Sequence, residues 1–324
     1  LKSELRLSPV ARDILELRYL NRNLEGDLVE DAVGMCFRVA RNIAQADKKY
    51  GGSVQGATQT FFEHLVSQDI VPASPILMHA GNTRQFLFSD HGMDVPDSVD
   101  DIFEVLKIAA SIPQPGGGVG FNFSKIRPRN DVVSGMKNVA FGPLSVMNIF
   151  DTSFSAILQG GRRSGANMSI IHISHPDVLR FIEAKKDPGV LTNFNLSIAV
   201  TDEFMKAVKG GGEFDLVNPR NGEVVRSVRA RYLFDAIVDQ AWSTGDPGVV
   251  FIDEMNRKYP FKDRSVLCTS SCGQYELESF EGVPYAHINL AKILTQRKGG
   301  YKIDEGKLRK LVRVAVHFLD NCVH

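Results

Sequence analysis

Cys272 is the residue of this sequence whose type and setting most clearly suggest chemistry. It lies in residues 268–274 (CTSSCGQ), downstream of two glycine-rich segments. These segments are residues 116–120 (GGGVG) and residues 159–167 (QGGRRSGAN). Glycine lets backbone N–H groups approach a ligand closely, as phosphate-binding loops require. The order of the three segments predicts a nucleotide site followed by a lone cysteine on a loop.

The two glycine-rich segments differ in how specifically they indicate a ligand site. Residues 116–120 follow a predicted helix and lead into a predicted strand, whereas a Walker A loop or a dinucleotide fingerprint lies between a strand and a helix. Both of those motifs are therefore excluded, and a tight turn explains the glycines equally well. In residues 159–167, Arg162 and Arg163 are planar donors suited to a phosphate or a base edge, although a solvated loop would have a similar composition.

Charge and cysteine content narrow the class of protein. Lys plus Arg and Asp plus Glu both number 38 in 324 residues, so no global basic field attracts nucleic acid, and the clustered arginines indicate an anionic small molecule.

Four cysteines are too few for a disulfide framework, and Cys36 and Cys322 lie on apolar helical faces typical of core packing. Cys268 and Cys272 lack further ligands for zinc, so we expect no metal site. No apolar run spans a membrane and no secretory signal is visible at Leu1, so we expect a cytoplasmic protein.

The elements that must position these residues change in type along the chain. Residues 1–70 are predicted to be a small all-helical region, with helices over 8–20, 29–47 and 58–66. Residues 71–324 alternate short apolar runs with helical patterns, which indicates parallel βα units and an α/β fold. The predicted strands cover 120–123, 168–173, 195–200 and 248–251, and the predicted helices cover 97–112, 143–158, 177–185, 202–208 and 230–243. Residues 210–228 are expected to form a hairpin that turns at Asn221 and Gly222, and a helix is expected from about Asp304, with a buried stripe of Leu308, Leu311, Val312, Ala315 and Leu319.

Nearly the whole chain resembles the adenosylcobalamin-dependent (class II) ribonucleotide reductases, in the catalytic subunit. Seven short motifs occur here in the order of that family. They are PASP at 72–75, GGGVGFNFS at 116–124, QGGRRSGANM at 159–168, HPD at 175–177, NFNLS at 193–197, GDPG at 245–248 and INLAK at 288–292.

The resemblance implies a fold and a set of site residues. The fold is the first half of a ten-stranded α/β barrel, with a loop that carries the radical cysteine, Cys272, through its centre. Adenosylcobalamin would be the cofactor, a ribonucleotide the substrate, and a deoxynucleotide or ATP the effector. The helices over 97–112 and 143–158 would form a homodimer contact. The substrate would face Ser74, Ser89, Gly117, Gly118, Ser270 and Gln274, and the effector would face Asp97, Ser98, Arg127, Arg162, Arg163 and Ala166.

The sequence departs from the family pattern at the residues that handle electrons and protons. Asp90 and Val283 stand where the family has its two reducing cysteines, and neither side chain can donate electrons. The family sequence Asn-Pro-Cys-Gly-Glu becomes SSCGQ at 270–274, and an amide such as Gln274 does not titrate as a general base. The second half of the barrel is also missing from the sequence.

Three interpretations therefore remain open. The chain could be a divergent or split reductase completed by a second polypeptide and an external electron donor. It could be a nucleotide-binding relative that has lost catalysis and acts through a partner, in which case substituting Arg162 and Arg163 should abolish nucleotide binding. It could also rearrange a nucleotide without net reduction, in which case turnover should require Cys272.

Overall fold

The computed structural model describes residues 5–159, 163–164 and 166–324, and no side chain between residues 158 and 165. The chain forms two compact units, and each is described by itself. The first contains Leu1–Ser89 together with Val283–His324, and the second contains Asp90–Gly282. None of the described helices has both the length and the apolar character needed to cross a membrane.

The first unit contains the predicted helical region. Its helices are α1 (Pro9–Arg18), α2 (Ala32–Ile43), η1 (Ala44–Tyr50), α3 (Val54–Val66) and α4 (Ser74–His79). Ser8, Asp31 and Ser53 begin α1, α2 and α3, and each side chain accepts a hydrogen bond from a backbone N–H of the first turn. The predicted helix over 29–47 is thus shorter, because Asp31 caps it and leaves Val29 exposed.

The last part of the chain folds onto these helices. Strand β1 (Ile70–Pro72) pairs antiparallel with β14 (Ala286–Ile288), and η2 (Leu290–Ile293), β15 (Leu294–Arg297), β16 (Gly300–Ile303) and α11 (Glu305–Asn321) follow. Phe318 of α11 packs edge-on against Phe61 of α3, with ring centroids 5.2 Å apart. Cys36 and Cys322 are buried in the same core, which confirms their predicted packing role. The predicted stripe of α11 was wrong at Val312, which is 43% exposed because one residue past Leu311 rotates the side chain by about 100°.

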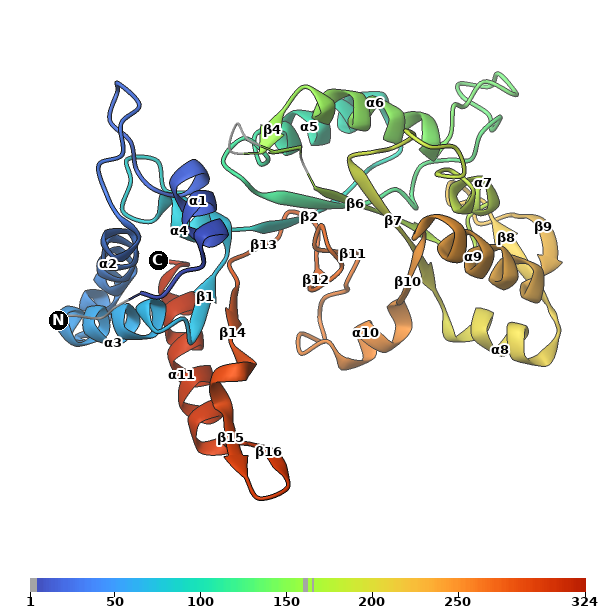
Figure 1. Ribbon diagram of the computed structural model, residues 1–324. Coiled ribbons are helices and arrows are strands. Elements are labelled where there is room, and N and C mark those ends of the chain that lie inside the picture. The colour runs from blue at the N-terminus through green and yellow to red at the C-terminus, as the bar shows by residue number, and fades with distance from the viewer. Residues whose placement is uncertain (1–4, 160–162, 165) are drawn as a thin grey trace. The chain divides into compact units, whose positions relative to one another are not determined.

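The second unit is built on five parallel strands (Figure 1). They are β2 (Asp90–Asp94), β3 (Gly118–Asn122), β6 (Asn167–His172), β7 (Phe194–Val200) and β10 (Gly248–Phe251), in the spatial order β10-β7-β6-β3-β2. Within the described residues these strands form an open sheet, which corresponds to the expected first half of a barrel. The predicted strands are confirmed to within two residues, and β2 is an additional strand.

Helices α5 (Val99–Ala110) and α6 (Pro143–Ser155) lie side by side against one face of this sheet (Figure 1). Phenylalanines fill the space between α6 and the strands. Phe121 of β3 is fully buried and meets Phe150 and Phe154 of α6 at centroid distances of 5.2 and 5.9 Å. Because side chains alternate across a strand, the residues on either side of Phe121 must point to the opposite face of the sheet.

The remaining elements complete the second unit. They are the short strands β4 (Leu158–Gln159) and β5 (Arg163–Ser164), the helices α7 (Val178–Ile182), α8 (Asp202–Gly210), α9 (Ala230–Thr244) and α10 (Ile252–Lys258), and the strands β8 (Glu213–Val217), β9 (Val224–Arg229), β11 (Cys268–Thr269) and β12 (Glu276–Leu277). The short strand β13 (Gly282–Val283) lies at the boundary between the two units. Strands β8 and β9 form the predicted hairpin, and Gly222 in its turn has φ 75°.

Candidate functional site

The cysteine loop, which we define as residues 268–277, is a short hairpin with Cys272 in its turn. Its strands β11 and β12 pair antiparallel, with Cys268 opposite Leu277. Ser270 closes the turn: its N–H donates to the Tyr275 carbonyl at 2.9 Å, and its Oγ accepts from the Gln274 N–H at 2.9 Å. Cys272 is exposed, so its thiol is accessible to a molecule from outside the loop.

Three glycines make room for the cysteine loop on the sheet. A Cβ atom on Gly120 would lie 1.7 Å from the Thr269 carbonyl oxygen, and one on Gly118 would lie 2.4 Å from Ser271 Oγ. A Cβ atom on Gly92 of β2 would lie 2.5 Å from the carbonyl oxygen of residue 278. No other residue type fits these positions without displacing the loop. The run at 116–120 therefore serves, at Gly118 and Gly120, the close approach of a protein loop, while Gly116 turns the chain with φ 103°.

Hydrogen bonds fix the loop to two strands. The Ser271 hydroxyl donates to Asp90 Oδ1 of β2 at 2.9 Å. Asn195 of β7 donates through Nδ2 to the Ser271 carbonyl, also at 2.9 Å. Ser271 Oγ lies 3.8 Å from Cys272 Sγ, within hydrogen-bonding distance for sulfur. The exposed thiol thus sits on a rigid support.

Burial controls the ionisation of the groups under the loop. Asp90 is 3% exposed, and burial raises the pKa of its carboxyl, while the hydrogen bonds from Ser271 act in the opposite direction. The pKa of Tyr275 is raised by burial and by the nearby Asp90 charge. His91, the next residue of β2, has a lowered pKa because burial disfavours the imidazolium. Asp90 therefore holds its proton more readily than an exposed aspartate does.

Cys268, at the base of the loop, differs from Cys272 in its burial. It is fully buried, its Sγ contacts the Leu277 carbonyl at 3.6 Å, and burial raises its pKa to about 12. Both cysteines are free thiols. Among the residues described, we find no group of three or more His, Cys, Asp or Glu side chains arranged to hold a metal ion. Cys268 thus packs as an apolar side chain, and Cys272 is the accessible thiol of the loop.

Two side-chain contacts involve residues of the cysteine loop. Ser270 Oγ lies 3.5 Å from Gln274 Oε1, and Ser271 is bonded to Asp90. Val283 is half-buried in the first unit. A proline at position 271 could not donate a hydrogen bond to Asp90, whereas Ser271 does.

A separate cavity brings together three of the predicted effector residues. It has a volume of about 220 Å³ and is lined by Asp97 and Ser98 before α5, by Arg127 after β3, and by apolar residues that include Ile102 and Phe141. Arg127 binds Asp97 twice, through its backbone N–H at 3.0 Å and its Nε at 2.7 Å. Ser98 caps α5. The cavity thus has a polar end, where the Arg127 guanidinium is paired with the Asp97 carboxylate, and an apolar wall.

The remaining predicted residues are placed less completely. Arg162 lies outside the described residues, and for Arg163 only the backbone is described, in β5 opposite Gln159. Ala166 is half-buried and its carbonyl accepts the Val119 N–H at 3.4 Å. Gly117 follows Gly116 in the turn before β3, and its backbone N–H donates to Ile112.

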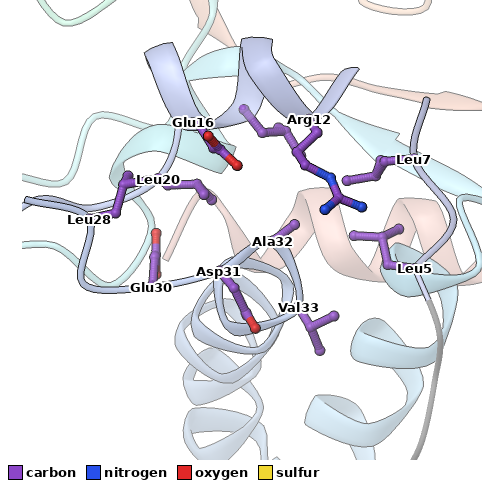
Figure 2. A pocket seen from close by; sticks show the side chains of 11 residues that line it. Leu5, Leu7, Arg12, Glu16, Leu20, Leu28, Glu30, Asp31, Ala32 and Val33 are labelled. Carbon is purple, nitrogen blue, oxygen red and sulfur yellow. The ribbon is translucent and has the colours of Figure 1, made fainter. Parts of the chain in front are cut away.

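Two predicted substrate residues belong to the first unit. Ser74 begins α4, and its hydroxyl lies 2.7 Å from the Tyr19 hydroxyl. Ser89 is 6% exposed, and its Oγ has no hydrogen-bond partner among the described residues. The first unit also holds a cavity of about 280 Å³ lined by leucines and by charged side chains of α1 and of the segment before α2 (Figure 2). Two of those acids already have structural roles, since Glu30 pairs with Arg38 and Asp31 caps α2.

Sequence reasoning missed the residues that support Cys272 from below and one further cavity. Asn195 was part of a motif, but nothing in the sequence connects it with the cysteine loop. The cavity, of about 340 Å³, lies at the carboxyl ends of β3, β6 and β7 and is lined by Ser124, His172 and Leu267, among others. Burial lowers the pKa of His172, and its Nδ1 accepts the Ser174 N–H at 3.2 Å. A histidine at the end of a predicted parallel strand was the available signal.

Comparisons with known proteins agree with this geometry. The family model described as "Ribonucleotide reductase, all-alpha domain" matches residues 5–85, and "Ribonucleotide reductase, barrel domain" matches residues 91–324. A protein of Thermoplasma acidophilum named vitamin B12-dependent ribonucleoside-diphosphate reductase is 37% identical over 99% of this chain and 49% of its own length. A protein of the same name from Mycobacterium tuberculosis is also 37% identical, over 99% of this chain and 46% of its own length.

More distant relatives extend the same family. The monkeypox virus ribonucleoside-diphosphate reductase large subunit is 26% identical over 95% of this chain and 43% of its own length. The chain spans about half the length of the curated relatives it matches. The resemblance carried by the seven motifs is thus confirmed, and the chain belongs to the ribonucleotide reductase family.

Proposed function

We propose that this chain supplies the cysteine loop and the first half of the barrel to an enzyme that reduces ribonucleotides to deoxyribonucleotides by thiyl-radical chemistry. The observation that carries the proposal is the setting of Cys272. Its thiol is exposed at the tip of a hairpin that is held against the sheet by Asp90, Asn195 and three glycines. A radical on sulfur must be held within reach of one substrate hydrogen, and such a support restricts its motion.

The proposed cofactor is adenosylcobalamin, because relatives covering nearly all of this chain are named as vitamin B12-dependent. The structure fits this cofactor in one respect: the thiol that must give up its hydrogen atom faces outward, while Cys268 is buried. When bound, adenosylcobalamin supplies the radical chemistry that removes this hydrogen atom. The corrin ring would be held mainly by the half of the barrel that this sequence does not include.

The proposed substrate and effector sites follow the predicted residues. In the second unit, a ribonucleotide would contact Gly117, Gly118, Ser270 and Gln274. A deoxynucleotide or ATP would bind in the cavity of Asp97, Ser98 and Arg127, and the segment of Arg162, Arg163 and Ala166 would relay its identity. The grouping of Asp97, Ser98 and Arg127 around one cavity supports this assignment.

The proposed assembly has two parts. A second polypeptide segment would add strands beyond β10, and a second copy would pack on α5 and α6. Val99 and Phe103 of α5 are 56% and 52% exposed, which supports an apolar contact there. We further propose that residues 1–70 are a helical region, that residues 71–324 are the barrel part, and that the enzyme is cytoplasmic.

A second function is favoured by Asp90. A carboxyl in place of a reducing cysteine, together with Val283, leaves the described site without the thiol pair that would deliver electrons. The chain would then bind nucleotides and regulate a partner without reducing them.

One experiment separates the two functions. The chain is combined with a polypeptide that completes the barrel, adenosylcobalamin, dithiothreitol and each of the four ribonucleotides, and deoxyribonucleotide formation is measured by chromatography. The reductase proposal expects product that disappears in Cys272→Ser. If no product forms from any ribonucleotide while calorimetry still detects deoxynucleotide binding, the binding function is the correct one.

A further inference from the structure

The contact between Asp90 and the cysteine loop suggests a role for this carboxyl beyond holding the loop. Asp90 is buried and titratable, and neither electron delivery nor nucleotide binding uses it. Its Oδ1 accepts the Ser271 hydroxyl at 2.9 Å, and Ser271 Oγ lies 3.8 Å from Cys272 Sγ. The three side chains thus form a continuous chain of hydrogen-bonding groups that leads from a buried acid to an exposed thiol.

We propose that Asp90, Ser271 and Cys272 form a proton relay that lets the Cys272 thiol ionise by passing its proton to the buried carboxyl. The proposal goes beyond ribonucleotide reduction, because it concerns the proton of the thiol and is measurable without any nucleotide.

The chemistry of the relay balances without another reactant. The S–H bond of Cys272 breaks as an O–H bond forms at Ser271 Oγ, and the original Ser271 O–H bond breaks as an O–H bond forms at Asp90 Oδ1. The products are a thiolate and a carboxylic acid, and Ser271 is regenerated with its hydroxyl now donating to sulfur. No electron is transferred, so Asp90 needs no redox activity for this role.

Two features of the site favour transfer to Asp90. Burial raises the pKa of the carboxyl, so the proton acceptor is a stronger base than an exposed aspartate. A side chain at position 118 would displace the Ser271 hydroxyl, so Gly118 leaves this hydroxyl the room that it occupies beside Asp90. The other titratable groups near the relay are His91, on the opposite face of β2, and Tyr275, whose raised pKa keeps it neutral at pH 7. Asp90 is therefore the acceptor that Ser271 reaches.

The test is the pH dependence of alkylation of Cys272 by iodoacetamide in the full chain, followed by peptide mass spectrometry. Cys36, Cys268 and Cys322 are buried, so only Cys272 should react while the protein is folded. A relay couples two titrations, so the wild-type rate should rise in two steps, first as Asp90 ionises and again as the thiol itself loses its proton. Asp90→Asn should give a single step, because no carboxyl remains to titrate together with the thiol.

Ser271→Ala is the second variant, because it keeps the carboxyl and interrupts the path. It should also give a single step, and the unreacted Cys268 in both variants shows that the loop has stayed in place. Because Asp90 still titrates in Ser271→Ala, a two-step profile in this variant would show that the two groups are coupled without the relay, which would overturn it. A single step in the wild-type protein would by itself overturn the relay.

Discussion

Gly120→Ala should displace the cysteine loop from the sheet. The new Cβ atom would lie 1.7 Å from the Thr269 carbonyl oxygen, whereas carbon and oxygen normally approach to about 3.3 Å. The loop would therefore have to move by roughly 1.5 Å, the difference between these distances. Both anchors at Ser271, from Asp90 and Asn195, measure 2.9 Å and would be lost by such a movement.

The size of this effect follows from the broken hydrogen bonds. Each contributes about 1 kcal/mol, and Asp90 would be left buried without its partner at a further cost of about 1–3 kcal/mol. We expect the free energy of unfolding to fall by about 3–5 kcal/mol, as measured by urea denaturation. The movement should also expose Cys268, so that two thiols instead of one react rapidly with a disulfide reagent.

Gly210→Ala is the matched control. Gly210 ends α8, has no positive φ, and a Cβ atom there would have no neighbour within 4 Å. This variant should keep one rapidly reacting thiol and stay within about 1 kcal/mol of the wild type. A Gly120→Ala protein with one reactive thiol and unchanged stability would refute the reasoning that the glycine exists to admit the loop.

Three further outcomes are expected. Phe121→Ala should lower the free energy of unfolding by about 3–5 kcal/mol in urea denaturation, because the buried ring would leave a cavity against α6; a loss below about 1 kcal/mol would contradict the packing. The hydrogen bond from Arg220 holds the pKa of Asp131 well below its usual range, so the ionised carboxylate stabilises the fold above the ordinary aspartate pKa and this stabilisation is lost in strong acid. Arg220→Ala should therefore reduce the loss of thermal stability between about pH 5 and pH 2. An unchanged loss would show that the Arg220–Asp131 pair does not cause it. Arg127→Ala should weaken deoxynucleotide binding at least about tenfold in calorimetry, since a charge-assisted hydrogen bond contributes about 1.5–3 kcal/mol, and equal affinity would place the effector elsewhere.

The strands that could be predicted from the sequence are those with a run of apolar residues. Residues 194–200 alternate little and are almost wholly buried, so their apolar run was visible. Strand β2 was missed because Asp90, Gly92 and Asp94 occupy one of its faces and resemble a polar loop. Those three residues contact or adjoin the cysteine loop. Because the strand supports this loop, it lacks the alternation of apolar and polar residues by which strands are recognised.

The candidate site was predictable in its residues but not in its contacts. The family resemblance implied that Cys272 lies on a loop and that Asp97, Ser98 and Arg127 lie together, and the structure brings the last three to one cavity. The bond between Ser271 and Asp90 joins residues separated by 181 positions, and no local pattern encodes such a pairing. The glycines at 118 and 120 were visible, but their purpose depends on a segment that folds against them from far along the chain.

The glycine-lined face of the sheet also bears on how the second unit folds. Strands β2, β3, β6, β7 and β10 all precede the cysteine loop in the chain, so during synthesis they emerge before the segment that covers them. Contacts between such distant segments form slowly, and a waiting sheet with an apolar face would attract other chains. At positions 92, 118 and 120 this face exposes backbone and no apolar side chains. We expect this part of the sheet to attract other chains less than an apolar surface would while it waits for the loop.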